Sequence, residues 1–106
     1  MNITSQITKE IKQTVLDIDP TAEVILFGSR ARGDFHEESD WDVLVLTKGD
    51  EATAKLKKKE IRSHLYDLEL AKSQIIFAMV HSHEFWENAL SGTPLYLEIQ
   101  KDGVRV

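Results

Sequence analysis

The chain has 106 residues, 42% of them hydrophobic and 29% charged, which is typical of one soluble globular domain with a modest core. It contains no cysteine, which excludes disulfides, thiolate metal sites and a cysteine nucleophile, and which favours an intracellular location. The formal net charge of −5 argues against direct nucleic-acid binding. No apolar stretch reaches the roughly 18 residues of a membrane span. We expect a cytoplasmic protein.

An amphipathic helix is predicted over residues 3 to 18. Its apolar side chains recur at intervals of four, four, four and three residues, which places them on one helix face: Ile3, Ile7, Ile11, Val15 and Ile18. Asn2 and Thr4 are both candidate N-caps, and Asp19-Pro20 ends the helix because the residue before a proline disfavours helical geometry. We expect this helix to pack on a sheet.

Two short strands with a polar loop between them are predicted next. Val24–Phe27 and Val43–Leu46 are continuous apolar runs, as expected of interior strands that are covered on both faces. The loop between them, Gly33–Ser39, carries charged side chains that we expect to face solvent. The polar ends of the two strands are expected to meet, and ligands often bind beyond such strand ends.

Two carboxylates stand at the start of the second strand. Because side chains alternate along a strand, Asp40 and Asp42 share one face, with Cβ atoms about 6–7 Å apart, while Trp41 points to the other. Two carboxylates held side by side repel each other unless a cation lies between them. Mg²⁺ prefers oxygen ligands and is usually held by one or two carboxylates together with substrate phosphates.

A Gly-Ser turn follows the first strand. Gly28 allows the backbone to turn and to approach a ligand closely, and Ser29 can open a short helix through Ala31 whose free N–H groups face an anion. Arg30 and Arg32 add positive charge nearby, and we expect both to take part in nucleotide binding. The pattern therefore predicts a metal-plus-triphosphate site, with the turn on the phosphates and the two aspartates on the metal.

The rest of the chain predicts three helices and a third strand. Good helix formers run from about Asp50 to Leu70, with Ile61, Leu65 and Leu68 as the buried stripe and a run of lysines as a solvated face: Lys55, Lys57, Lys58 and Lys59. Gln74–Val80 then reads as a strand that is apolar on both faces.

Two short helices complete the predicted order. Ser82 is the expected N-cap of a helix through Leu90, and Thr93 with Pro94 begins a last helix that Gly103 ends. Val104–Val106 either adds a short strand or trails off. The predicted order indicates an α/β (α+β) fold with a small mixed sheet flanked by helices.

The central motif resembles that of a known superfamily. Gly28-Ser29, ten intervening residues and Asp40-x-Asp42, each half preceded by an apolar strand, resemble the signature of the DNA polymerase β-like nucleotidyltransferases. The best match is the minimal nucleotidyltransferase (MNT) branch, on the segments Phe27–Gly33 and Ser39–Asp42. The resemblance implies a single nucleotidyltransferase domain over residues 1–106 and a nucleotidyltransferase-like fold.

The resemblance also implies roles for individual residues. Members of the superfamily use metal ions and three carboxylates to direct an acceptor hydroxyl onto the α-phosphate of a nucleotide, and they release pyrophosphate. By this resemblance Asp40 and Asp42 are catalytic metal ligands, and Gly28 and Ser29 contact the nucleotide, with the charges of Arg30 and Arg32 nearby.

One expected carboxylate is missing from the motif. The third acid normally lies on the next strand, but Gln74–Val80 contains none, and Phe77 or Met79 stands on the face where it is expected. Glu69 and Asp67 lie just before this strand, within the predicted helix.

Two hypotheses follow from the sequence. In the first, the chain is a Mg²⁺-dependent enzyme that transfers a nucleotidyl group, most simply AMP from ATP, to a protein or a small acceptor. In the second, it is a catalytically impaired module that docks on a partner protein.

Proteins resembling this one are commonly paired with a helical HEPN-type protein as antitoxins. An apolar docking surface near the C-terminus is one reading of Trp86, Tyr96 and Leu97, and packing in the core is the other.

Overall fold

A mixed sheet with the strand order β3-β2-β1-β4 lies at the centre of the computed structural model. The structure describes residues 3–106, with side chains from Gln6 onward. Its strands are β1 (Glu23–Phe27), β2 (Trp41–Thr47), β3 (Ile76–Ser82) and β4 (Val104–Arg105). β1 pairs antiparallel with β2 and with β4, whereas β2 and β3 are parallel. The antiparallel register places the end of β1 beside the start of β2, as the sequence predicted.

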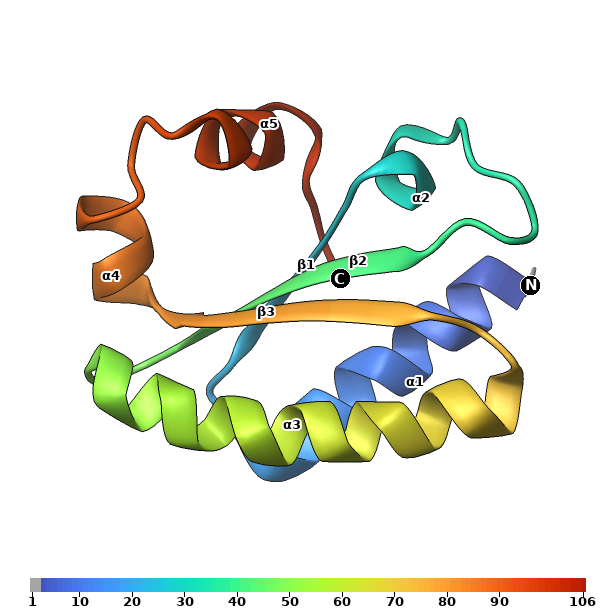
Figure 1. The fold of residues 1–106 in the computed structure, drawn as a ribbon, viewed down its shortest axis with the longest axis horizontal. Coiled ribbons are helices and arrows are strands. Elements are labelled where there is room, and N and C mark those ends of the chain that lie inside the picture. The colour runs from blue at the N-terminus through green and yellow to red at the C-terminus, as the bar shows by residue number, and fades with distance from the viewer. Residues whose placement is uncertain (1–2) are drawn as a thin grey trace.

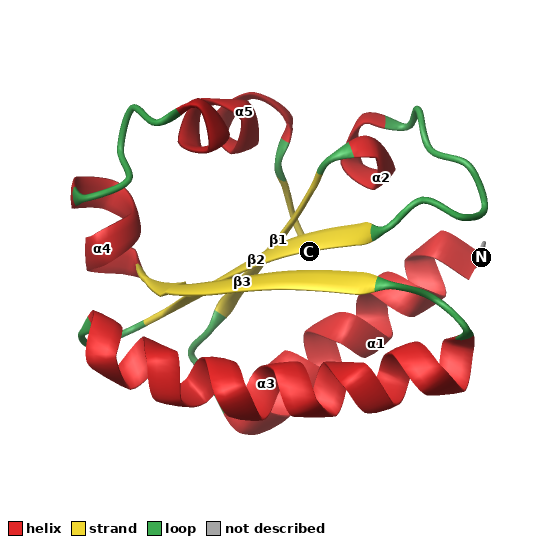
Figure 2. Ribbon diagram, viewed as in Figure 1, coloured by secondary structure: helices red, strands yellow, loops and turns green. Residues whose placement is uncertain are grey.

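Helices cover both faces of this sheet (Figures 1 and 2). α1 (Ile3–Ile18) and the long α3 (Glu51–Lys72) lie on one face, while α4 (His83–Asn88) and α5 (Pro94–Asp102) lie on the other. The four-residue α2 (Ser29–Arg32) stands at the end of β1. This arrangement confirms the predicted α/β (α+β) class and the small mixed sheet flanked by helices. Within the described residues, every helix is too short or too polar to cross a bilayer.

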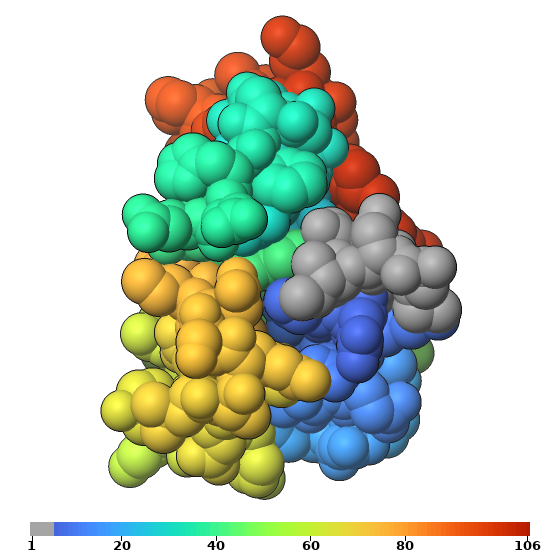
Figure 3. Space-filling model, turned by 90° about the vertical axis from the view of Figure 1, so that its right-hand side faces the viewer, coloured from blue at the N-terminus to red at the C-terminus, as the bar shows by residue number. Residues whose placement is uncertain are grey.

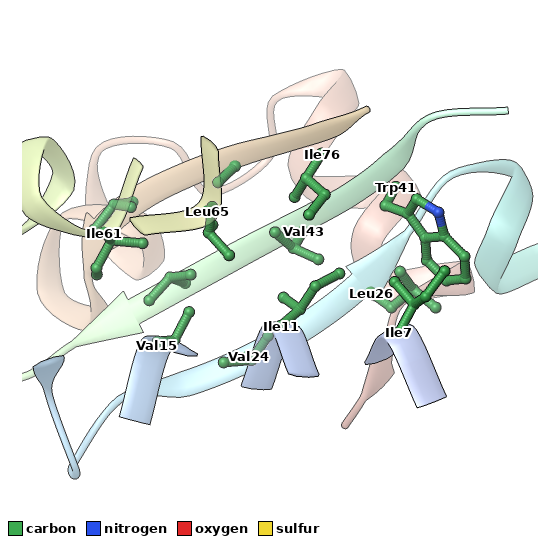
Figure 4. Close-up of a cluster of buried hydrophobic side chains, with 13 residues drawn as sticks. Ile7, Ile11, Val15, Val24, Leu26, Trp41, Val43, Ile61, Leu65 and Ile76 are labelled. Carbon is green, nitrogen blue, oxygen red and sulfur yellow. The ribbon is translucent and has the colours of Figure 1, made fainter. Parts of the chain in front are cut away.

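Each face of the sheet has its own hydrophobic core. The larger core joins one side of the strands to α1 and α3 (Figure 4) and includes buried side chains such as Ile7, Ile11, Val15, Trp41, Val43, Val45, Ile61 and Leu65. The smaller core lies under α4 and α5 and contains Phe27, Leu44, Leu46, Trp86 and Ile99. Because both faces are covered, β1 and β2 read as continuous apolar runs.

Several predicted boundaries differ by about two residues from those of the structure. α3 extends to Lys72, and Ser73 ends it in the left-handed conformation, with φ of 54°. β3 begins at Ile76 and runs to Ser82, later than the predicted Gln74–Val80. α4 ends at Asn88, short of Leu90. At the C-terminus, where the sequence left open a short strand or an irregular end, Val104 and Arg105 form the strand β4 and pair with β1.

The predicted helix starts agree with the structure where it describes them. The side chains of Ser82 and Thr93 accept hydrogen bonds from the backbone N–H groups of Phe85 and Tyr96, respectively. Asp50 caps α3 in the same way. Of the two candidate N-caps of α1, Asn2 lies outside the described residues. Thr4 lies within them, but the described side chains begin at Gln6.

Candidate active site

The polar ends of β1 and β2 meet at one edge of the molecule, where Phe27 pairs with Asp42. The turn at Gly28 follows β1 directly, and Asp40 precedes β2 directly. The antiparallel register therefore brings the two halves of the sequence motif together. Trp41 is fully buried in the larger core, so Asp42, the next residue along the strand, points to the opposite face of the sheet.

Gly28 lies against the side chain of Asp42, where the two halves of the motif meet. Its φ of 74° and ψ of −159° lie in a backbone region that essentially only glycine adopts. A Cβ atom at this position would overlap the carboxylate oxygen Oδ2 of Asp42 and would lie 3.3 Å from its Cγ atom. The carbonyl of Gly28 accepts hydrogen bonds from the N–H groups of Ala31 and Arg32, both at 3.1 Å, and so begins α2. The short helix through Ala31 that the sequence predicted is thus present.

The carboxylates of the motif are crowded by negative charge. Asp40 is exposed and Asp42 is half-buried. Burial raises the pKa of Asp42, the charges of Asp40 and Glu98 raise it further, and the Arg32 guanidinium partly offsets this rise. An environment of this kind favours binding of a cation, which would relieve the repulsion.

The two arginines of α2 have different surroundings. Arg32 lies on the side of Asp42, and its side chain pairs with Asp34 at 3.2 Å and with Glu98 at 3.4 Å. Arg30 is buried, with 8% of its surface exposed, and its guanidinium stacks on Trp41 and bonds to carbonyls of the loop before Asp40. The sequence grouped both charges at the phosphates, but only Arg32 faces the carboxylates.

The structure places an aromatic side chain where the third carboxylate was expected. Phe77 of β3 pairs with Asp42 in the parallel register, and its side chain is 49% exposed. Met79 follows on the same face, whereas Ile76, Ala78 and Val80 point into the larger core. Within the described residues, no three His, Asp or Glu side chains form a group that could hold a metal ion.

Neither acid that precedes β3 replaces the missing carboxylate. The Glu69 carboxylate accepts a hydrogen bond from the backbone N–H of Ile76 at 3.1 Å, so it is engaged at the edge of the sheet. Asp67 is exposed on α3. The acid that the sequence did not single out is Glu98 of α5, which reaches Arg32 and acts on the pKa of Asp42. Its approach depends on the packing of α5, for which the motif contains no signal.

The three residues considered for an apolar surface near the C-terminus differ in their exposure. Trp86 is 1% exposed and packs in the smaller core, where its ring lies 5.2 Å from that of Tyr96. The hydroxyl of Tyr96 donates to Glu87 at 2.7 Å. Leu97 is the exposed member, with 58% of its surface accessible. The reading of Trp86 as a core residue is therefore confirmed.

Comparison with known proteins identifies the family of this fold and motif. A model of the nucleotidyltransferase domain matches residues 8–95. A Methanocaldococcus jannaschii protein that is provisionally named a protein adenylyltransferase is 51% identical over 59 residues, which are 54% of this chain and 59% of that protein. The chain therefore spans less than two thirds of this relative.

A solved structure supports the fold independently of close sequence identity. It is described as the crystal structure of a toxin-antitoxin with AMP-PNP, and it shares 19% identity with this chain at a TM-score of 0.54. The similarity covers 92% of this chain and 69% of that one. Because the family model spans most of the sequence and includes both halves of the motif, the chain belongs to the nucleotidyltransferase domain family.

Proposed function

We propose that this protein transfers AMP from ATP to a hydroxyl group of a partner protein, at the site formed by the Gly28-Ser29 turn, Asp40 and Asp42. The observation that carries the proposal is the contact between Gly28 and the Asp42 carboxylate, which brings the turn and the acidic pair of the motif to one place. The relative named as a protein adenylyltransferase supports both the adenylyl group and a protein as the acceptor.

The acidic pair fits a hard divalent cation. Asp40 and Asp42 supply two carboxylates, and Mg²⁺ is usually held by one or two carboxylates together with substrate phosphates and water. Burial raises the pKa of Asp42, and the charges of Asp40 and Glu98 raise it further; a bound cation would offset this negative charge. When bound, Mg²⁺ would also neutralise charge on the phosphates and orient the reacting oxygens. We propose Mg²⁺ as the cofactor on these grounds.

The residues of the turn are proposed to hold the triphosphate. The N–H groups of Ser29 and Arg30 are in the first turn of α2, where they have no partner within the helix, and Gly28 leaves room for the close approach of a ligand. Arg32 would add positive charge on the same side of the sheet. Asp40 and Asp42 would face the phosphates from the other half of the motif.

The proposed reaction exchanges one phosphorus–oxygen bond for another. The acceptor hydroxyl oxygen forms a bond to the α-phosphorus of ATP, the bond between the α-phosphorus and the bridging oxygen breaks, and pyrophosphate leaves. The hydroxyl proton passes to water, since β3 carries no carboxylate that could accept it. The chain's own contribution is to position the triphosphate and to hold the two aspartates beside it.

We propose a helical HEPN-type protein as the acceptor, with the chain acting as the antitoxin of a toxin-antitoxin pair. The structural neighbour is a toxin-antitoxin bound to an ATP analogue, and it shares this fold. In this proposal the partner is neutralised by adenylylation of a tyrosine or by binding alone. The exposed Leu97, on the same helix as Glu98, is a candidate contact.

A binding module without catalysis is the alternative, and one observation favours it. Phe77 occupies the position beside Asp42 where a third carboxylate is expected, so the site has two acids of the motif and not three. In this alternative the chain would bind the same helical partner and leave it unmodified.

Affinity purification from the source organism, followed by mass spectrometry of the copurified proteins, tests the proposal. We expect a helical partner that carries an added adenylyl mass on tyrosine. An unmodified helical partner would support the binding module, whereas recovery of the chain alone, or only with itself, would contradict both forms of the partner proposal. The same purification with Asp40→Asn and Asp42→Asn combined is the matched control, and the added mass must disappear.

A further inference from the structure

Arg30 is buried although it belongs to a short helix beside an exposed loop. With 8% of its surface accessible, it is the arginine with the least exposure among the described residues. Burying a guanidinium is unfavourable unless its donors are bonded, and here burial lowers the pKa of Arg30. The contacts that this side chain makes therefore need a structural explanation.

The donors of Arg30 are directed to the segment that leads into Asp40. Its Nε and Nη2 atoms donate to the carbonyl of Ser39 at 3.3 and 3.0 Å, and Nη2 also donates to the carbonyl of Glu37 at 3.2 Å. Residues 33–38 are all exposed, and Figure 3 shows this loop on the surface, next to the segment that joins α3 to β3. Hydrogen bonds between His36 and Ser39 close a turn within this loop, and the guanidinium ties that turn to α2.

Two aromatic rings hold the same guanidinium. The Cζ atom of Arg30 lies 4.6 Å from the ring centroid of Phe35, which belongs to the loop, and 4.3 Å from that of Trp41, which begins β2. Trp41 is itself fixed, because its Nε1 donates to Gln74 at 2.9 Å and its backbone N–H donates to Ile75 at 2.8 Å. A planar guanidinium can stack on rings and bond to carbonyls in its plane at once, which a lysine ammonium cannot do.

These contacts lie on both sides of Asp40 along the chain. Arg30 bonds to the carbonyl of Ser39, the residue before Asp40, and stacks on Trp41, the residue after it. Its own backbone belongs to α2, whose N-cap is Gly28. One side chain therefore connects the Gly28-Ser29 turn to the backbone that carries Asp40.

We infer that Arg30 is a positioning residue, which holds Asp40 at the site without touching the nucleotide. This inference rests on the proposed function, since it assumes that Asp40 binds a metal–nucleotide complex. It differs from the expectation from the sequence, in which Arg30 binds the nucleotide through its charge. A residue that orients a metal ligand in this way typically changes metal affinity about 10–100-fold when it is replaced.

The test compares Arg30→Lys with the native protein by two measurements. Binding of Mn²⁺ with a non-hydrolysable ATP analogue, followed by electron paramagnetic resonance, reports on the site, because Mn²⁺ takes the same oxygen ligands as Mg²⁺. Amide hydrogen exchange reports on the loop, where the N–H of Ser39 bonds to the carbonyl of His36 at 3.0 Å. Arg62→Lys, at an exposed position of α3, is the matched control.

We expect Arg30→Lys to weaken the binding of Mn²⁺ with the analogue at least about tenfold. We also expect it to accelerate exchange at Ser39 while exchange in β1 and β3 stays as in the native protein. Arg62→Lys should change neither quantity. Phe35→Leu removes one ring from a loop residue that is 39% exposed, so it tests the same contact without the risk of unfolding the core, and we expect smaller changes in the same direction.

The outcomes separate this inference from the proposed function. Native affinity in Arg30→Lys would overturn the inference, whatever the loop does. Weaker binding with unchanged exchange at Ser39 would also overturn it, because it would indicate a direct contact between the guanidinium and the nucleotide. If the native protein binds no Mn²⁺ with the analogue, the proposed function fails. In that case unchanged exchange in Arg30→Lys would overturn the claim that Arg30 holds the loop, and faster exchange would support it.

Discussion

Gly28 lies so close to Asp42 that a methyl group at position 28 would overlap the carboxylate oxygen Oδ2 and would stand 3.3 Å from Cγ. The contact joins the residue directly after β1 to the carboxylate of Asp42, whose backbone pairs with Phe27 in the antiparallel register. The requirement for glycine here is therefore twofold: the backbone conformation, with φ of 74°, and the space that the aspartate occupies.

Gly28→Ala should destabilise the fold more than Gly33→Ala does. Both glycines have positive φ, 74° and 88°, but a Cβ atom at Gly33 meets no atom within 4 Å. We expect Gly33→Ala to cost about 1 kcal/mol of unfolding free energy from backbone strain alone. Gly28→Ala should cost about 2 kcal/mol or more, because it adds a clash with Asp42 to a more strained backbone. Urea denaturation measures both values.

A double-mutant cycle isolates the clash from the strain. Asp42→Ala removes the carboxylate, so in that background Gly28→Ala should cost about 1 kcal/mol less than in the native protein. Costs for Gly28→Ala that are equal in the two backgrounds would show that the aspartate does not occupy the space beside Gly28.

Asp42→Asn should stabilise the metal-free protein at neutral pH. Burial and the charges of Asp40 and Glu98 raise the pKa of Asp42 in the folded state above its ordinary value of 3.8. Below that ordinary value the carboxyl is protonated in both states, and no penalty exists. As the pH rises through the folded-state pKa, the folded form resists ionisation that the unfolded chain has already completed, so stability is lost.

The difference between Asp42→Asn and the native protein should therefore be larger at pH 7 than at pH 3. Thermal unfolding at both pH values measures it, with Asp67→Asn on the exposed side of α3 as the control. A difference that is the same at pH 3 and pH 7 would mean that burial and the charges of Asp40 and Glu98 do not raise the pKa of Asp42 in the folded state.

Ser29→Ala should weaken nucleotide binding about three- to tenfold and leave the fold intact. The substitution removes one hydroxyl from the turn and keeps the backbone N–H groups of α2 in place, so at most one hydrogen bond to the phosphates is lost. Isothermal titration of ATP in the presence of Mg²⁺ measures the affinity. Unchanged affinity, with native stability, would place the phosphates away from this turn.

The residues of the motif show what the sequence could predict and what it could not. Local rules sufficed for the caps at Ser82 and Thr93 and for the opposite directions of Trp41 and Asp42, because each depends on neighbouring residues only. The meeting of the two strand ends was predicted from the polar residues at those ends, Gly28-Ser29 after the first strand and Asp40 before the second.

Contacts between segments that are distant in the chain could not be predicted from the sequence. Arg30 bonds to Gln74 at 3.5 Å across 44 residues, and no rule based on neighbouring residues predicts this contact. Glu98 reaches Arg32 across 66 residues, through the packing of α5 on the smaller core. β3 begins later than predicted, after Gln74, whose backbone N–H bonds to the carbonyl of Glu69 at the end of α3 and whose side chain accepts from Trp41.

Phe77→Asp should raise the metal affinity of the site. The side chain of Phe77 is 49% exposed beside Asp42, so an aspartate there adds a third carboxylate without opening a cavity in the core. We expect binding of Mn²⁺ with ATP to tighten about tenfold, because metal affinity rises with the number of charged ligands. Phe77→Asn, which has the same shape as the aspartate but no charge, should bind no more tightly than the native protein.

An equal gain in both variants at position 77 would contradict the placement of the metal beside Asp42. If nucleotidyl transfer appears only in Phe77→Asp, the native chain is the binding module of the alternative proposal, and the missing carboxylate is the reason.

The most direct test of the proposed activity is transfer of label from ATP that is labelled at the α-phosphate, with the copurified partner as the acceptor. We predict that label becomes covalently bound to the partner when Mg²⁺ is present, and that chelation of Mg²⁺ stops the transfer. The combined substitution of Asp40→Asn and Asp42→Asn should reduce the transfer to background while the complex still forms. No transfer by the native protein, or transfer that persists in the doubly substituted protein, would contradict catalysis at this site.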